Sequence, residues 1–512
     1  MKKIFGFLAH RVVVIAFAIL AQLAFLLFIL VKFQAKFVYF YAISAVLSFL
    51  VVVYILNRNQ NPAYKLAWVI PILIFPIFGG IFYLMFGKSK LSQSEHRKMI
   101  SVAKNVMEYL NDEKTEVMAA LEESDPVGAC QSRYLAKYAY SPVWNNTETT
   151  YLPMGEVKFE HMVEELKKAQ HFIFLEYFIV NEGKMWNTIL DILTEKAQQG
   201  VDVRMIYDDM GCIMTLPYGY DKKLAQRGIK CKIFNPFIPI MSMRFNNRDH
   251  RKICVIDGNV GFTGGINLAD EYINARVRHG HWKDTAIMLR GDAVWNLTIL
   301  FLSMWDYLAD EKEDFNKFRP DIHAALPENC DGFVQPFADS PLDGECVGET
   351  VYLNMINKAQ KYIYITTPYL IIDNEMVVAL CIAAKNGIDV RIITPHVPDK
   401  WYVHAVTRAY YETLIESGVK IYEYTPGFIH AKTYVCDDQY AVVGTINMDY
   451  RSLYLHFECG VLLCGGKIIQ SIYDDFLLTL EQCEEISLKA CREVPPLRRM
   501  GRGLLRVFAP LM

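Results

Sequence analysis

The feature that most restricts how this 512-residue chain can fold is a motif that occurs twice, offset by 180 positions from His250 to His430. The first copy reads HRKICVIDGNVGFTGGIN and the second reads HAKTYVCDDQYAVVGTIN. Six residues recur in register: His250, Lys252, Asp257, Gly264, Ile266 and Asn267 in the first copy, and His430, Lys432, Asp437, Gly444, Ile446 and Asn447 in the second. Self-similarity at a fixed offset indicates duplicated structural units, so we expect two related halves.

The duplication extends to both sides of the motif. Upstream, KKAQHFIFLEYFI with GVDVRMIYDD corresponds to NKAQKYIYITTPYLI with GIDVRIITPH, each typical of a helix end, an apolar strand, a helix and a second strand. Downstream, an acidic residue, Asp284 or Glu458, enters a further strand. Helices that alternate with β-branched strands are typical of α/β domains. The predicted fold class is therefore α/β, with two α/β sandwich halves packed about a pseudo-twofold axis.

The polar residues of the motif are candidates for an active site. In a strand, a His and a Lys two positions apart point to the same face, and each copy ends its second strand in Asn. A pseudo-twofold axis would bring both sets to one space. The candidate residues are His250, Lys252, Asp257, Asn267, His430, Lys432, Asp437 and Asn447. Asp257 and Asp437 open turns, so turn formation explains them first and catalysis second.

Two imidazoles and two ammonium groups around one space favour phosphodiester chemistry without a metal. One neutral histidine can attack phosphorus while the other, protonated, donates to the leaving alkoxide. The lysines and asparagine amides can hold the non-bridging oxygens. We expect Asp284 and Glu458 to orient the imidazoles, as carboxylates do in other histidine-based sites.

Neither a metal nor another cofactor is expected. No His, Cys and carboxylate cluster occurs at metal-ligand spacing in the sequence. Gly87-Lys88-Ser89 resembles the end of a phosphate-binding loop, but Phe82 stands where that motif requires glycine. Nucleic acid is not expected as a partner either, because 53 Lys and Arg against 56 Asp and Glu leave a net charge of -3.

The first 90 residues are strongly apolar. Three uncharged stretches, 12–31, 37–56 and 66–86, each approach the roughly 20 residues that a helix needs to cross a bilayer. We expect two transmembrane helices, followed by a third segment that either spans the membrane or is re-entrant, because it contains Pro71, Pro76 and a Gly pair. Flanking positive charges do not fix the orientation. The 12 cysteines, irregularly spaced and without CxxC, favour catalytic halves in the cytoplasm.

These features predict five regions. They are a membrane anchor at 1–90, linker helices at 91–140, the first half at 141–325, the second half at 326–486 and a basic amphipathic tail at 487–512. The tail RRMGRGLLRVFAPLM combines arginines with apolar residues, which suits either an interfacial segment on anionic lipid or a frayed basic terminus. The sequence leaves the oligomeric state open.

HRKICVID and HAKTYVCD, each followed by G-x-I-N, resemble the HxKxxxxD signature of the phospholipase D superfamily. Within it the chain is similar to bacterial cardiolipin synthases, through NPAYKLAWVIPILIFPIFGGIFYLMFG, YLPMGEVKFEHMVEELKKAQHFIFLEYFIV, GGINLADEY and GTINMDYRSLYLHFECG. The resemblance implies a phosphatidyltransferase of the bacterial cell membrane that converts two phosphatidylglycerol molecules into cardiolipin and glycerol through a phosphohistidine. Its partners would be phosphatidylglycerol and anionic membrane lipid. By analogy His250 is the nucleophile and His430 the general acid and base, although the repeat itself does not order them.

One position departs from that family. The residue after the motif glycine, commonly Ser in the family, is Gly265 in the first half and Thr445 in the second. The phosphate-binding set implied by the resemblance is therefore Asn267, Asn447 and Thr445. Four alternatives stay open: a phospholipase D hydrolase, a phosphatidyltransferase with another lipid donor or acceptor, a nuclease and an inactive membrane scaffold. The intact His and Lys positions argue against the scaffold, and the apolar stretches against the nuclease.

Overall fold

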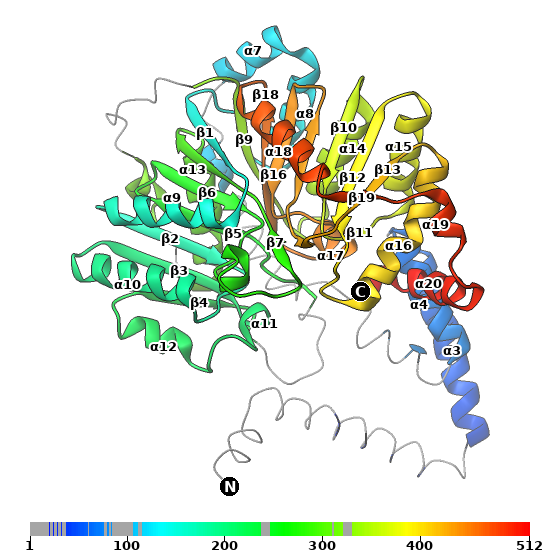
Figure 1. Ribbon diagram of the computed structural model, residues 1–512. Coiled ribbons are helices and arrows are strands. Elements are labelled where there is room, and N and C mark those ends of the chain that lie inside the picture. The colour runs from blue at the N-terminus through cyan, green and yellow to red at the C-terminus, as the bar shows by residue number, and fades with distance from the viewer. Residues whose placement is uncertain are drawn as a thin grey trace.

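Two α/β halves lie side by side in the computed structural model, the first coloured cyan to green and the second yellow to red (Figure 1). The structure describes residues 20, 24, 28, 32, 37–59, 61–75, 79–80, 83, 106–110, 115–236, 246–309, 312–320 and 330–511. The predicted pair of α/β halves is confirmed, since each half is a mixed sheet with helices.

The first half contains a seven-stranded sheet in the order β1-β8-β6-β5-β2-β3-β4. β2, β3 and β4 are parallel to one another, and the remaining pairs are antiparallel. The strands are β1 (Thr147–Leu152), β2 (Phe172–Tyr177), β3 (Asp202–Asp208), β4 (Lys230–Phe234), β5 (Lys252–Ile256), β6 (Val260–Gly264) and β8 (Ala286–Gly291). The helices are α9 (Gly155–Lys168), α10 (Lys184–Gln198), α11 (Asp209–Cys212), α12 (Tyr220–Ala225), η3 (Asp270–Ile273), α13 (Val294–Ala309) and η4 (Phe315–Phe318).

The second half repeats this topology strand for strand. Its sheet has the order β19-β13-β12-β10-β15-β16-β18-β9, in which β19 is an additional edge strand. The strands are β9 (Phe333–Asp339), β10 (Tyr362–Thr366), β12 (Asp389–Pro395), β13 (Lys420–Tyr424), β15 (Thr433–Cys436), β16 (Tyr440–Gly444), β18 (Glu458–Cys464) and β19 (Cys483–Glu485). The helices are α14 (Val347–Lys358), α15 (Asn374–Lys385), α16 (Trp401–Glu416), α17 (Tyr450–Tyr454) and α18 (Ile468–Leu480). A short pair, β11 (Leu370–Ile371) with β17 (Met448–Asp449), completes it.

The motif strands are buried throughout because both faces of each sheet are covered. Every residue of β5, β6, β15 and β16 is buried. Strands that are buried on both faces are mostly apolar along their length, and polar and apolar residues do not alternate in them. α13, which follows β8, and α18, which follows β18, share one apolar cluster with residues of both sheets.

Within that shared core, each half packs its sheet on its own helix in an equivalent way. Phe174 of β2 stacks on Phe301 of α13 with ring centroids 4.6 Å apart, and Tyr364 of β10 stacks on Phe476 of α18 at 4.8 Å. β7 (His281–Lys283) of the first half also pairs in parallel with β14 (Gly427–Ile429) of the second. The halves are thereby fixed with the beginnings of both motifs facing each other.

The apolar amino-terminal stretches are described only in part. Stretch 12–31 lies outside the described residues except at isolated positions. Stretch 37–56 is α3 (Phe37–Leu56), with side chains described at Tyr39 and from Tyr41 onward, and α4 (Pro62–Ile74) covers the start of stretch 66–86. No helix among the described residues is long and apolar enough to cross a membrane, so the transmembrane helices expected from the sequence are not supported there.

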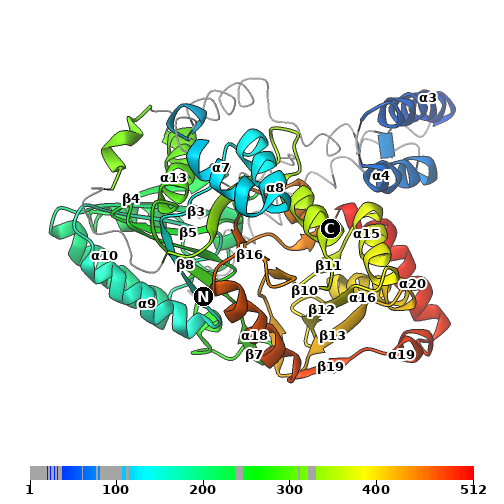
Figure 2. The same ribbon diagram turned by 90° about the horizontal axis from the view of Figure 1, so that it is seen from above.

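Helices from both ends of the chain lie against the second half (Figure 2). The linker region contains α7 (Thr115–Ser124) and α8 (Pro126–Tyr138), and Asp125 between them accepts a 2.7 Å hydrogen bond from Tyr440. The tail forms α19 (Leu488–Arg492), α20 (Pro496–Val507) and η5 (Ala509–Leu511). Arg506 of α20 lies over the ring of Tyr410 in α16, 4.1 Å from its centroid. The five predicted region boundaries remain predictions.

Candidate active site

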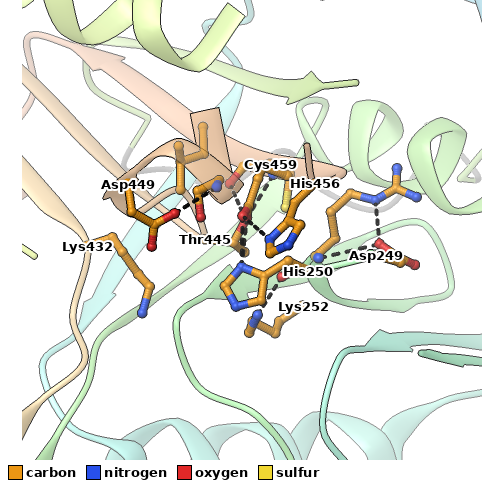
Figure 3. Close-up of polar contacts among 12 residues, drawn as sticks. Asp249, His250, Lys252, Lys432, Thr445, Asp449, His456 and Cys459 are labelled. Atoms are coloured by element: carbon orange, nitrogen blue, oxygen red, sulfur yellow. Dashed lines mark hydrogen bonds and ion pairs between the residues drawn. The ribbon is translucent and has the colours of Figure 1, made fainter. Parts of the chain in front are cut away.

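A cavity of about 760 Å³ lies between the halves, where the two motifs meet. Its walls contain His250, Asn267 and Trp282 from the first half and His430, Asn447 and His456 from the second. The two motif histidines therefore open into the same space. Figure 3 shows His250 beside His456, with Asp449 and Lys432 on the opposite side of His250 from Asp249.

Each motif histidine is held by the other half of the molecule. His250 Nδ1 lies 2.9 and 3.0 Å from the two carboxylate oxygens of Glu458, and His430 Nδ1 lies 2.7 Å from Asp284 Oδ2. The backbone repeats the crossing, since His250 N donates to Phe457 O and His430 N donates to Lys283 O. With Nδ1 engaged by a carboxylate, Nε2 is the nitrogen available for chemistry in both rings.

The motif lysines are buried beside the histidines. Lys252 Nζ donates to the backbone carbonyl of His250, and Lys432 Nζ donates to that of His430. Burial lowers the pKa of Lys252 to about 8 and that of Lys432 to about 7, because the charged ammonium loses its hydration. Both ammonium groups can still offer positive charge to a bound phosphate near neutral pH.

The two histidine–carboxylate pairs differ electrostatically. Burial raises the pKa of Asp284 to about 7, so this carboxyl keeps a proton for part of the time at neutral pH. Burial by itself would raise the pKa of Glu458 as well, but the charge and hydrogen bond of His250 outweigh it and the pKa lies below its ordinary value. Burial lowers the pKa of His250 to about 3 and also lowers that of His430, where the charges of Lys432 and Lys252 add to it.

The residues after the motif glycines also differ between the two pairs. Thr445 is fully buried, does not line the cavity and donates its hydroxyl to Glu458 Oε2. Its hydroxyl is therefore directed at the carboxylate that pairs with His250, and the predicted contact of Thr445 with phosphate stays a prediction. At Gly265 an added Cβ would lie 2.0 Å from Asp284 Oδ1. The first half has no hydroxyl here because the Asp284 carboxylate occupies its space.

The motif aspartates are structural in this arrangement. Asp257 accepts three backbone hydrogen bonds of 2.7 to 2.8 Å from residues 170–172, and Asp437 accepts three of 2.7 to 2.9 Å from residues 360–362. Both have positive φ, 50° and 54°, a conformation that Asp tolerates in turns. Neither lines the cavity. They tie the turn after β5 or β15 to the start of β2 or β10, as turn formation would require, and their catalytic role stays a prediction.

The two predicted asparagines line the cavity in different states. Asn267 Oδ1 accepts from Ile179 N at 2.9 Å, and its Nδ2 donates to Tyr272 at 2.8 Å. Asn447 Oδ1 makes no hydrogen bond with any described residue. The oxygen of the Asn447 amide is therefore not fixed by a described residue, whereas the Asn267 amide is held in the cavity wall at both its oxygen and its nitrogen.

His456 belongs to the site but was not singled out from the sequence. Its ring centroid lies 5.7 Å from that of His250, and its Nδ1 lies 3.7 Å from Glu458 Oε1. Neither ring nitrogen makes a hydrogen bond with a described residue. His250, His456 and Glu458 form the one group in the described part of the chain whose ligand atoms, all within 4.8 Å, could hold a metal ion. The repeat could not reveal His456, because Trp282 stands two residues before the acid in the first half.

Duplicated α/β halves with two HxKxxxxD motifs facing one cavity define a protein of the phospholipase D superfamily. The chain matches the family model described as cardiolipin synthase, PLD-like domain, over residues 162–279 and 352–478. Residues 46–88 match the model described as phospholipase D-nuclease N-terminal.

Relatives at full length give the narrower assignment. The chain is 36% identical to a cardiolipin synthase of Alkalihalophilus pseudofirmus over 89% of this chain and 90% of that protein. It is 43% identical to an uncharacterised protein of Streptococcus mutans over 90% of this chain and 99% of that one. The chain therefore belongs to the cardiolipin synthase family. The crystal structure of a phosphatidylserine synthase of Haemophilus influenzae has a similar fold, with a TM-score of 0.54 and 16% identity over 71% of this chain and 93% of that one.

Proposed function

We propose that this phosphatidyltransferase of the phospholipase D superfamily moves a phosphatidyl group from one phosphatidylglycerol to another and forms cardiolipin and glycerol. The observation that carries the proposal is the reciprocal pairing of His250 with Glu458 and of His430 with Asp284 around one cavity. Two oriented imidazoles on opposite sides of a phosphodiester provide one nucleophile and one proton donor, which is what displacement at phosphorus requires.

In the first step, His250 Nε2 attacks the donor phosphorus and forms an N–P bond. The P–O bond to the donor's glycerol breaks, and the proton of the His430–Asp284 pair passes to the leaving glycerol oxygen. Lys252, Lys432 and the Asn447 amide stabilise the charge on the non-bridging oxygens. In the second step, a primary hydroxyl of the acceptor attacks phosphorus, His430 takes its proton, and the N–P bond breaks to release cardiolipin.

The difference between the two pairs supports this order of roles. A nucleophilic imidazole must be neutral, and burial holds the pKa of His250 at about 3. Its partner Glu458 is ionised and polarises the Nδ1–H, which makes Nε2 more electron-rich. A general acid must carry a proton, and Asp284, with a pKa of about 7, lets the His430–Asp284 pair keep one near neutral pH.

We also propose that the enzyme works at the bacterial cell membrane, where both lipids reside. The amino-terminal helices support this, because Ile43 and Phe49 of α3 and Leu73 of α4 expose more than half of their side-chain surface. Large apolar side chains gathered on exposed helices mark an interaction surface for lipid or protein. Aromatic residues in the cavity wall, such as Trp282 and Phe428, would limit water as a competing acceptor.

Mass spectrometry of lipids tests the function directly. Purified full-length enzyme is incubated with phosphatidylglycerol vesicles in EDTA, beside His250→Ala and His430→Ala variants. We expect cardiolipin and glycerol with the wild type and neither with the variants. Phosphatidic acid as the product would identify a hydrolase, and an absence of product would redirect the search to other lipid donors.

A further inference from the structure

The pseudo-twofold repeat places opposite charges at equivalent positions of the cavity. Glu271 follows the motif residue Asn267 by four positions, as Arg451 follows Asn447, and both line the cavity. Glu271 is buried in η3 and forms a 3.0 Å ion pair with Arg278, so the first half presents a neutralised pair there. The second half presents a guanidinium from α17.

Arg451 differs from the other basic groups of the cavity wall. Arg248 pairs with Asp208 at 3.3 Å, Arg278 pairs with Glu271, and Lys400 lies 3.9 Å from Asp399. Arg451 has no ion-pair partner among the residues that the structure describes, although Asp449 acts on it from a longer distance. Burial lowers the pKa of Arg451, because its guanidinium has lost part of its hydration. A partly buried, unpaired guanidinium is costly to maintain unless an anion binds to it.

The reaction brings two anions into this cavity at once. The donor phosphate takes the histidines, the two buried ammonium groups and the Asn447 amide. The acceptor phosphatidylglycerol carries its own phosphodiester, whose charge needs a separate cation. Arginine suits this task, since its planar guanidinium binds two oxygens of a phosphate with parallel hydrogen bonds.

We propose that Arg451 binds the phosphate of the acceptor phosphatidylglycerol and so presents its glycerol hydroxyl to the phosphohistidine. This inference rests on the proposed function, and it names how a nearly symmetric cavity distinguishes acceptor from donor. The Glu271–Arg278 pair at the equivalent position is neutral overall and offers no net positive charge to a phosphate. An acceptor without a phosphate would gain nothing from Arg451.

Two reactions of the full-length enzyme distinguish an effect on the donor lipid from an effect on the acceptor lipid. Incorporation of labelled glycerol into phosphatidylglycerol uses the donor and a neutral acceptor, whereas cardiolipin formation needs the anionic acceptor. Both are measured on phosphatidylglycerol in mixed micelles for the wild type, Arg451→Gln, Arg451→Lys and Arg290→Gln. Arg290→Gln is the matched control, because it also removes one positive charge from an arginine. Arg290 is half-exposed, pairs with Glu165 at 3.2 Å and lies outside the cavity wall.

We expect Arg451→Gln to lower kcat/KM for cardiolipin formation by about 30-fold or more, the loss typical of a charge-assisted phosphate contact. Glycerol incorporation should keep most of its rate, which also shows that the variant is folded. The kcat/KM of Arg451→Lys for cardiolipin formation should lie between those of the wild type and Arg451→Gln. Arg290→Gln should match the wild type in both reactions.

An equal fall in both reactions, or no fall in either, would overturn the acceptor assignment while leaving the proposed function intact. A wild-type enzyme that incorporates glycerol but forms no cardiolipin would overturn both, because phosphatidylglycerol would then not be an acceptor. A wild type inactive in both reactions would overturn the proposed function, and this inference with it.

Discussion

Replacing Glu458 by Gln tests whether the first motif histidine depends on a carboxylate of the second half. Glu458 is fully buried, receives His250 Nδ1 at 2.9 and 3.0 Å and also accepts from Thr445. The substitution removes a charge-assisted hydrogen bond and lets the imidazole adopt the wrong tautomer. We expect a loss of about 2 to 4 kcal/mol in the transition state, or about 30- to 1000-fold in rate.

The assay is rapid-quench measurement of the phosphoenzyme formed from radiolabelled phosphatidylglycerol. Glu458→Gln should slow formation of the phosphohistidine, because it acts through the nucleophile. Asp284→Asn is the matched variant for the other histidine, because it acts through His430. It should also slow the breakdown of the phosphoenzyme, so that more phosphoenzyme is present at steady state than in Glu458→Gln.

The double variant completes the test. If Glu458 works only through His250, adding Glu458→Gln should not lower further any residual turnover that a long incubation detects in His250→Ala, since coupled residues are not additive. A wild-type rate in Glu458→Gln, or phosphoenzyme that accumulates in it, would refute the reasoning.

Three further outcomes follow from the site. Turnover should fall as the pH rises through about 7. Asp284 and Lys432 each have a pKa of about 7, so they then lose the protons that the reaction uses. A rate that increases steadily to alkaline pH would contradict this. Asp257→Ala should lower the free energy of unfolding by about 1 to 3 kcal/mol through three lost backbone hydrogen bonds, while kcat at low temperature stays close to that of the wild type; thermal melts and assays would expose a catalytic Asp257 by a collapse of kcat. Gly265→Ala should lower kcat by about tenfold or more, because the new Cβ displaces Asp284 from His430, and Gly501→Ala, in open space, is its control.

The duplication made much of the fold predictable. Apolar strands that alternate with helices indicate α/β halves, and the constant offset indicates that both halves have one topology. The additional edge strand β19 has no counterpart in the repeat and its short sequence, Cys483–Glu485, carries no strand pattern. Asp284 and Glu458 could be proposed from the sequence as the acids that orient the imidazoles. Which acid pairs with which histidine could not, because sequence adjacency contains no information on how the sheets dock.

The repeat did not show how Thr445 and the motif aspartates are hydrogen-bonded, and it did not reveal Arg451 or His456. Thr445 and the motif aspartates lie in the repeat, but their hydrogen bonds are directed into the protein rather than into the cavity. Arg451 and His456 lie in the cavity wall, but Glu271 and Trp282 occupy the corresponding places in the first half. A comparison of the two copies finds the residues that they share and overlooks those at which they differ.

The crossing of each carboxylate to the opposite histidine has an evolutionary consequence. A single-copy ancestor could have assembled this catalytic centre only as a dimer, in which each subunit completed the other. After fusion, a substitution that shifts Asp284 is felt at His430 in the second half, and one that shifts Glu458 is felt at His250 in the first. Drift in either half is thus constrained by the other.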